Sequence, residues 1–392
     1  MDKLRVGIIG TGSVVREIYQ YLYFHSSYSH LLDIAAACDP NEKALTEFCD
    51  KYHIAKDCRF TNYEQMIQKV KLDAVQVNTP DSLHEKPTVF ALGAGLDVVV
   101  PKPLTDTIPS AHNMIAAAQK SGRLLGIDFH KRDDPRFKEA AARVQKGPYG
   151  TFQAAVFYML DKLLVADPNH EPRFFASADF AVKNSPISFL TVHMADALMF
   201  VVNLRPVKVR TTGWSQKLPS LQPIAVAGYD MCDTEVTFTN GATAHILTGW
   251  HLPNTAHATT VQSARLIFTD GMLDLGLDTP GYHELTTEGV LERNPLFRNF
   301  EIDGSVTGYG ITNPGRIYQR FLRNRNGQLP DAERSRMMSP IELGFWTTVI
   351  LDAAEKSLRQ GTRSAAGVTT GVDVDVTKLV TAELGANAHN YL

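Results

Sequence analysis

The feature that most constrains the fold is the regular alternation of apolar, strand-like segments with helical segments over the first 130 residues. Strands separated by helices at this spacing pair in parallel through right-handed crossovers, and the helices cover both faces of the sheet. Such sheets bind ligands at the carboxyl ends of their strands. We therefore expect a doubly wound α/β domain. Its strands are predicted at 4–10, 31–39, 73–79, 96–100 and 123–129, and its helices at 11–24, 41–52, 63–70, 84–95 and 108–121.

Length and composition set the outer limits. A chain of 392 residues is longer than one core usually fills, so two domains are expected. With 21% charged residues and a net charge of -3, neither nucleic acid nor a membrane surface is an expected partner. No apolar run reaches about 18 residues, and a strand follows directly on "MDKL", so neither a membrane span nor a signal peptide is predicted. The four cysteines lack metal-site spacing, which favours free thiols in a reducing cytoplasm and no metal.

The turn after the first strand carries Gly10-Thr11-Gly12, the start of a G-x-G-x-x-G pattern. Glycines here let the backbone approach a pyrophosphate, which then sits on amides at the following helix N-terminus. Val15 occupies the third glycine position, but Asp39 ends the second strand, where an acid accepts hydrogen bonds from ribose hydroxyls. The pattern predicts dinucleotide binding, with NAD preferred over NADP. The alternative is a glycine turn without a nucleotide.

A lysine is held at the end of a buried strand. Lys102 follows three valines and stands between Pro101 and Pro103, which stop the strand and restrict the lysine backbone. A parallel sheet would place it at the ligand-binding edge. The alternative is an ordinary solvated loop lysine.

Five motifs in order resemble those of the Gfo/Idh/MocA oxidoreductases: "VGIIGTG", "ACDP", "NTPDSLH", "PKPLT" and "GIDFHKRDDPRF". The resemblance extends to "SPIELGFWTTVILDAAEKSLRQGT" late in the chain. It implies a Rossmann domain at 1–129 and an α+β domain at 130–392 for substrate binding and oligomerisation. It also implies that Lys102 is the catalytic lysine. The cofactor contacts implied are Gly10, Thr11, Gly12, Ser13, Val14, Asp39, Asn78, Thr79, Pro80, His84 and Lys102.

Two positions depart from the family pattern. Pro101 stands where the family's E-K-P motif has glutamate, and Phe189 stands where many members have the acid of D-x-x-x-H. His193 takes the histidine place, and we expect it to be catalytic. Without an acid at 189 the imidazole needs another partner, and Asp196 on the same helix face is one candidate.

Further polar residues are expected near the substrate. Ser185 and Pro186 read as an N-cap and first helical residue, which leaves Lys183 and Asn184 just outside the helix. A cation and an amide there suit a hydroxyl-rich or anionic substrate, although plain solvation is the alternative. The predicted substrate residues are Lys102, Arg132, Lys183, Asn184, His193, Asp196 and Tyr309.

The second domain is predicted to be a large, mostly antiparallel sheet with one helix-covered face. A helix is expected at 136–146, and a loop over the pocket at 160–184. The open face favours a homodimer or homotetramer through this sheet, as the resemblance also implies. Strands are expected at 151–159 and near 207–214, 232–239, 242–250, 259–268 and 282–287, with "TNGA" as a hairpin turn.

The resulting hypothesis is an NAD-dependent dehydrogenase of a sugar, cyclitol or sugar derivative. His193 would accept the hydroxyl proton and Lys102 would stabilise the developing negative charge on the oxygen, while the hydride moves to the nicotinamide. Two alternatives remain open. One is an NADPH-dependent keto-sugar reductase. The other is a dinucleotide-binding regulator without catalysis, which the substitutions at 101 and 189 leave open and the retained Lys102 and His193 argue against.

Overall fold

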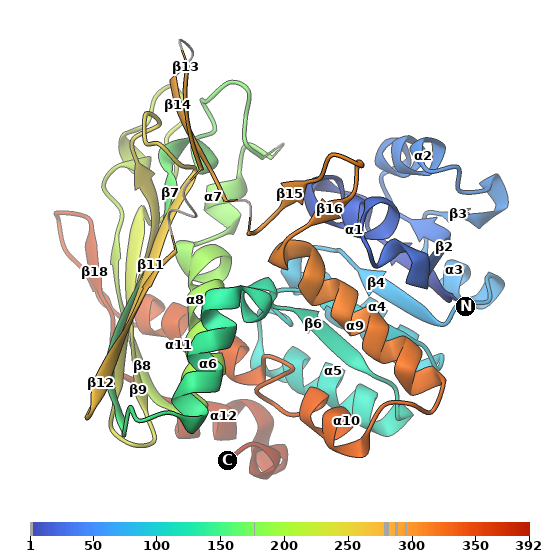
Figure 1. The fold of residues 1–392 in the computed structure, drawn as a ribbon. Coiled ribbons are helices and arrows are strands. Elements are labelled where there is room, and N and C mark those ends of the chain that lie inside the picture. The colour runs from blue at the N-terminus through green and yellow to red at the C-terminus, as the bar shows by residue number, and fades with distance from the viewer. Residues whose placement is uncertain (1–2, 176, 278–281, 287–288, 295) are drawn as a thin grey trace. The chain divides into compact units, whose positions relative to one another are not determined.

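The computed structural model describes residues 3–175, 177–277, 282–286, 289–294 and 296–392. The chain divides into two compact units, each built around its own sheet (Figure 1). The first unit contains residues 1–134 and 296–348, and the second contains residues 135–295 and 349–392.

The first unit is built on a parallel sheet that, in the described residues, has six strands in the order β3-β2-β1-β4-β5-β6. The order reverses beside β1, so the carboxyl ends of β1 and β4 open onto the switch point where doubly wound sheets bind ligands. The predicted Rossmann topology is confirmed. Its strands are β1 (Leu4–Ile9), β2 (Leu32–Cys38), β3 (Arg59–Phe60), β4 (Ala74–Val77), β5 (Asp97–Pro101) and β6 (Leu125–Asp128).

Helices cover this sheet, and their apolar sides form its core. A π-helical turn at Val15–Tyr19 leads into the first helix, whose side chains join the core of β1 and β2. A short hairpin of β15 (Asn299–Phe300) and β16 (Val306–Thr307) also belongs to this unit. The helices are α1 (Gln20–His25), α2 (Glu42–Lys51), α3 (Tyr63–Lys69), α4 (Glu85–Gly93), α5 (Ile108–Ser121), α9 (Tyr309–Arg325) and α10 (Asp331–Met337).

The structure corrects the predicted domain boundary. Residues 296–348 return to the first unit instead of belonging to one continuous domain at 130–392. The physical reason is α9, which buries Ile317, Tyr318 and Phe321 in the core of the parallel sheet. Tyr318 also donates a 2.8 Å hydrogen bond to Gln76 Oε1 on β4. The free energy gained by burying these apolar side chains exceeds the cost of bringing together segments that are far apart in the sequence.

The second unit contains a sheet of nine strands in the described residues, with β12-β11-β7-β10-β9-β8-β18-β17 in order and β19 beside β8. Every pair is antiparallel except β7 with β10, so the mostly antiparallel prediction holds. The strands are β7 (Phe152–Lys162), β8 (Pro206–Trp214), β9 (Met231–Phe238), β10 (Thr243–Leu252), β11 (Thr260–Phe268), β12 (Gly271–Gly276), β17 (Thr362–Arg363), β18 (Val368–Thr370) and β19 (Val374–Asp375). A separate hairpin pairs β13 (Tyr282–Thr286) with β14 (Gly289–Arg293).

Helices cover one face of this sheet. Phe157 on β7 is fully buried and stacks on Phe137, with ring centroids 6.4 Å apart. Along the same strand Val156 points the other way and is 48% exposed, so the alternate residues of β7 face opposite sides. The helices are α6 (Pro135–Lys146), α7 (Phe180–Lys183), α8 (Val192–Val202), most of α11 (Phe345–Arg359) and α12 (Val376–Leu384).

Most of the predicted strands of the second unit are present. The hairpin turn at 239–242 is confirmed by a hydrogen bond from Phe238 N to Ala242 O and by the positive φ of Gly241. Strand β12 was not predicted, and β13 does not join the main sheet. Within the described ranges, no helix combines the length and apolar character that a membrane span requires. All four cysteines lie in those ranges and form no disulfide.

Candidate cofactor and active site

The glycine turn after β1 allows a ligand to approach its backbone closely. Gly10 has a φ of 90°, and a Cβ there would lie 2.7 Å from the carbonyl oxygen of Asn78. A Cβ on Gly12 would meet no atom within 4 Å, so the space beside this backbone is open. The first hydrogen bond of the following helix runs from Arg16 N to Gly12 O, which leaves the preceding amides of Ser13 and Val14 without an intrahelical partner. This cradle fits a pyrophosphate.

Asp39 ties the glycine turn to the second strand. Its Oδ2 accepts hydrogen bonds from Thr11 N at 2.7 Å and Thr11 Oγ1 at 3.1 Å, and its Oδ1 accepts one from Asn41 N at 2.8 Å. An ionised carboxylate has about four acceptor sites, so these three bonds leave room for a ligand hydroxyl. Asp39 therefore has a structural role in this loop that the sequence pattern alone did not reveal.

Asn78 and Thr79 follow β4 at the same edge of the sheet. Asn78 Nδ2 donates to Gly10 O at 3.3 Å, and Asn78 Oδ1 accepts from Gln76 Nε2 at 3.0 Å. Thr79 Oγ1 is buried and has no hydrogen-bond partner. A buried hydroxyl without a partner is costly, and a bound polar group would satisfy it. Two observations therefore fit a dinucleotide at this edge: the open space beside the Gly12 backbone and the buried hydroxyl of Thr79.

His84 connects two loops of this edge. Its Nε2 lies 2.9 Å from Thr79 O, and its Nδ1 lies 3.2 Å from Pro103 O and 3.1 Å from Leu104 O. The side chain is 1% exposed. Its contacts hold the loop after β4 against the segment that follows Lys102. A contact of His84 with the cofactor stays a prediction.

Lys102 lies among ionisable side chains of the first unit. Burial raises the pKa of Asp81, and the nearby Lys102 and His84 oppose the rise. Burial lowers the pKa of His130 well below its usual value, and Lys131 and Lys102 act in the same direction. The lysine therefore lies in a partly desolvated, charged environment, unlike a solvated loop lysine.

A buried carboxyl also lies beside this lysine. Asp128 ends β6, is 3% exposed, and accepts a 2.8 Å hydrogen bond from the Tyr19 hydroxyl on its Oδ2. Its Oδ1 is buried and accepts no hydrogen bond. Burial is the main cause that raises the pKa of Asp128, and Asp133 acts in the same direction, whereas the Tyr19 hydrogen bond and Lys102 oppose the rise; the net pKa is about 7. The sequence motifs gave no sign of this residue.

Arg132 makes structural contacts. Its guanidinium donates to Glu342 Oε2 at 2.6 Å, Glu342 O at 3.1 Å and Ile341 O at 2.9 Å, and it lies 4.6 Å from the centre of the Phe129 ring. Its side chain is 8% exposed. These contacts compensate the buried charge of the guanidinium. A contact of Arg132 with substrate stays a prediction.

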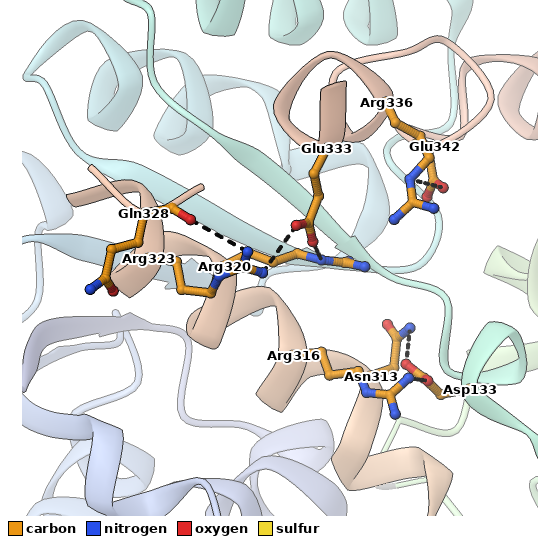
Figure 2. Close-up of polar contacts among 9 residues, drawn as sticks. All are labelled: Asp133, Asn313, Arg316, Arg320, Arg323, Gln328, Glu333, Arg336 and Glu342. Atoms are coloured by element: carbon orange, nitrogen blue, oxygen red, sulfur yellow. Dashed lines mark hydrogen bonds and ion pairs between the residues drawn. The ribbon is translucent and has the colours of Figure 1, made fainter. Parts of the chain in front are cut away.

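A second ionic group of the first unit surrounds Asp133. Asn313 Nδ2 donates to Asp133 Oδ2 at 3.1 Å, and Arg316 pairs with the other carboxylate oxygen (Figure 2). Further along the same helix, Arg320 and Arg323 share Glu333 of α10. The contacts of Asp133 fix α9 to the segment after β6, and the Glu333 pairs fix α9 to α10. The Asp133 contacts join residues 180 and 183 positions apart and were not predicted.

Tyr309 begins α9 and is 4% exposed. Its ring stacks on His130 at 5.8 Å and meets Phe297 at 5.3 Å. Among the substrate residues predicted from sequence, Tyr309 is thus placed beside His130, whose environment includes Lys102. A contact of Tyr309 with substrate stays a prediction.

In the second unit, His193 and Asp196 both lie in α8, where Asp196 is 1% exposed and His193 is partly exposed. Phe189 precedes them in a π-helical turn at Ile187–Thr191. Its ring packs against Phe180 at 5.1 Å, Phe175 at 5.6 Å and Trp250 at 6.1 Å. The position of the family's acid is therefore part of an aromatic cluster. The catalytic role of His193 stays a prediction.

The cap predicted before this helix is confirmed. Ser185 Oγ accepts hydrogen bonds from Ile187 N at 3.1 Å and Ser188 N at 3.2 Å, and it donates to Glu355. Lys183 is 68% exposed and forms an i,i+4 ion pair with Asp179, and Asn184 Nδ2 donates to the Phe180 carbonyl at 2.9 Å. Contacts of Lys183, Asn184 and Asp196 with substrate stay predictions.

Residues 4–129 match the model of the GFO_IDH_MocA family, described as an oxidoreductase family with an NAD-binding Rossmann fold. These residues, about a third of the chain, are thus similar to the NAD-binding domain of the Gfo/Idh/MocA oxidoreductases. The resemblance predicted from the five motifs is confirmed, and so is the expected NAD-binding fold.

Characterised relatives of this family extend the comparison. The chain is 29% identical to D-glucoside 3-dehydrogenase of Escherichia coli over 209 residues, 52% of this chain and 56% of that protein. It is 32% identical to 1,5-anhydro-D-fructose reductase of Ensifer adhaerens over 147 residues, 37% of this chain and 42% of that protein. The chain thus spans about half the length of the curated relatives it matches.

Solved structures share the fold over nearly the whole chain. The scyllo-inositol dehydrogenase of Lactobacillus casei, determined with NAD(H) and scyllo-inositol, aligns with a TM-score of 0.71 at 16% identity. The alignment covers 96% of this chain and 99% of that one. This likeness confirms the predicted combination of a Rossmann domain with an α+β domain.

Proposed function

We propose that the protein is an NAD-dependent dehydrogenase that oxidises a secondary alcohol of a sugar, a cyclitol or a sugar derivative. The observation that carries this proposal is Lys102, fixed at the carboxyl end of β5 among buried ionisable groups of an NAD-binding fold. The dehydrogenase names among its relatives and structural neighbours support the substrate class.

Bound NAD would supply the hydride acceptor. The turn from Gly10 to Val14, with Asp39 and the residues Asn78, Thr79, Pro80 and His84, would hold it. Lys102 donates hydrogen bonds to the substrate oxygen and stabilises the negative charge that develops there. His193 accepts the hydroxyl proton as general base. Asp196 and Tyr309 complete the proposed substrate contacts.

A reductase acting on a keto-sugar with NADPH is the second candidate. The match to 1,5-anhydro-D-fructose reductase favours it. The Asp39 carboxylate disfavours it, because a 2′-phosphate beside this anion would be repelled.

We propose further that the protein forms a homo-oligomer through the open face of the nine-stranded sheet. Val156, Tyr158 and Leu160 of β7 face outward, and Tyr158 pairs across the sheet with Leu247. Leu160 pairs with Val261 of β11, and nearby Ile267 is 41% exposed. A sheet face with exposed aliphatic side chains is stabilised when a second protein surface covers them.

The test uses purified protein with NAD and a panel of sugars, glycosides, inositols and sugar acids, followed at 340 nm, with the reverse reaction assayed with NADPH and keto-sugars. The wild type is expected to oxidise at least one polyol. Lys102→Ala should lower turnover by about 100-fold and change the NAD dissociation constant by only a few-fold, as for loss of one donor to a developing oxyanion.

Three other results would contradict the proposal. Normal turnover by Lys102→Ala would remove this lysine from the mechanism. Activity confined to keto-sugars with NADPH would favour the reductase. Tight NAD binding without turnover of any compound would favour a regulator.

A further inference from the structure

This chain has no carboxyl group next to Lys102 in its sequence, but the neighbouring strand β6 carries one. Pro101 occupies the position of the glutamate in the family's E-K-P motif, and its direct partner in the parallel pair of β5 and β6 is Asp128. Residues paired in this way project toward the same face of the sheet. The Asp128 side chain therefore lies beside the side chain position of residue 101.

Asp128 is held in place and sheltered from water. The Tyr19 hydroxyl donates to its Oδ2 at 2.8 Å, and the carboxyl group is 3% exposed. The other oxygen, Oδ1, is buried and accepts no hydrogen bond, so it has capacity for a cation or a proton. A carboxyl that only filled space would be expected to satisfy both oxygens within the protein.

The charged and titratable groups facing Asp128 come from three segments. They are Tyr19 and Tyr23 from the first helix, Lys102 after β5, and Asp133 in the segment after β6. Asp133 is already paired with Arg316 and Asn313, so its charge is largely compensated. Lys102 is the cation that favours ionised Asp128, and by reciprocity ionised Asp128 favours protonated Lys102.

We propose that Asp128, held by Tyr19, is the positioning residue for Lys102 and supplies from β6 the carboxylate that the chain lacks at Pro101. Its charge keeps the lysine protonated and oriented, which is the state that can donate to a developing oxyanion. This proposal deepens the role given to Lys102 and rests on the proposed function for its catalytic meaning. The pairing itself can be measured without any substrate.

The experiment is competitive acetylation of the native protein with acetic anhydride between pH 6 and 10, with the modified Lys102 peptide quantified by mass spectrometry. Asp128→Asn removes the anion, so the pKa of Lys102 falls. Its labelling at pH 8.5 should then rise by about three-fold or more, because a fall of one pKa unit increases the reactive, deprotonated fraction by up to about ten-fold. The double variant Asp128→Asn/Pro101→Glu restores a carboxylate from the other strand and should return labelling toward the wild-type level.

Asp97→Asn is the matched control. Asp97 is also a buried carboxyl of β5, burial raises its pKa to about 6, and it accepts a 2.9 Å hydrogen bond from Leu124 N. It begins the strand that Pro101 ends, so its replacement should leave Lys102 labelling unchanged. If Asp128→Asn does not fold, Tyr19→Phe provides the test, since loss of its hydrogen bond disfavours the Asp128 anion and should raise labelling in the same direction.

The outcomes separate the two proposals. Wild-type labelling curves in both Asp128→Asn and Tyr19→Phe would overturn the role of Asp128, whatever the enzyme oxidises. An equal shift in Asp97→Asn would also overturn it, because the effect would then be general. Where labelling shifts as expected but the wild type oxidises no polyol, the pairing stands and the proposed function fails.

Discussion

At the residue scale, Asp39 has one task that the structure shows and a second that we propose. It fixes the glycine turn through Thr11, and its remaining acceptor capacity is proposed to serve the ribose hydroxyls. The second task is a prediction from sequence, because the acid follows a strand at a recognisable interval. The first task depends on the side chain reaching back across 28 residues and could not be predicted from the pattern.

We predict that Asp39→Ala weakens NADH binding and narrows or reverses the preference over NADPH, because the anion that repels a 2′-phosphate is lost. Thr11→Ala is the control, since it removes only the hydroxyl contact to Asp39 and keeps both the anion and the backbone bond. Dissociation constants for the two cofactors should therefore keep their wild-type order in Thr11→Ala. Tighter binding of NADPH than NADH by the wild type would contradict the assignment of Asp39.

Asp128 and Arg132 also show, at this scale, what a local sequence pattern does not encode. Arg132 stands in a basic stretch that resembles a substrate-binding motif, but burial and Glu342 determine its contacts. Asp128 has no sequence signal, because its importance comes from a cross-strand partner and from Tyr19, 109 residues earlier. Burial and pairing are tertiary properties, which local patterns do not encode.

At the element scale, the strands and helices of the first domain were predictable because apolar periodicity determines them. Their boundaries agree closely, as for the helix at 108–121, which starts after the Thr107 cap and ends at Gly122 in the left-handed region. The return of α9 to the parallel sheet was not predictable. Its amphipathic pattern indicates a helix with a buried face but does not say which sheet receives that face.

The aromatic cluster around the π-helical turn at Ile187–Thr191 leads to a prediction for Phe189. Phe189→Asp should lower the free energy of unfolding by about 2 kcal/mol or more at pH 8, since a carboxylate would replace a ring packed on Phe175, Phe180 and Trp250. Phe189→Leu, the control that keeps an apolar group, should cost less, about 1 kcal/mol.

The pH dependence of Phe189→Asp follows from the direction of its pKa. Desolvation would raise the pKa of the new carboxyl in the folded state, so its protonated form is tolerated at low pH and the loss of stability grows as pH rises through that value. Urea unfolding of the wild type and both variants at pH 5 and pH 8 measures this difference. A Phe189→Asp protein as stable as Phe189→Leu at pH 8 would show that the position tolerates the family's acid.

At the scale of the whole molecule, the residues of the proposed mechanism come from two folding units. The first unit holds the glycine turn, Asp39, Lys102 and Asp128, and the second holds His193 in α8. The second unit also has a sheet with helices on one face and an open face with exposed aliphatic side chains. Exposed aliphatic side chains on a sheet favour a covering surface, and this argument, together with the family resemblance, is the basis for predicting an oligomer.

We predict that Val156→Arg shifts the protein toward a smaller oligomer, because a charge at the centre of the open face would have to be desolvated on pairing. Val156 is 48% exposed, and its cross-strand partners are Arg265 and His245. Neither partner is an anion that would pair with the new arginine. Val182→Arg is the matched control, since Val182 is an equally exposed valine, at 57%, on α7 instead of the sheet. Light scattering after size exclusion measures both masses. A wild-type protein that is monomeric at micromolar concentration, or an equal change in both variants, would contradict pairing through this face.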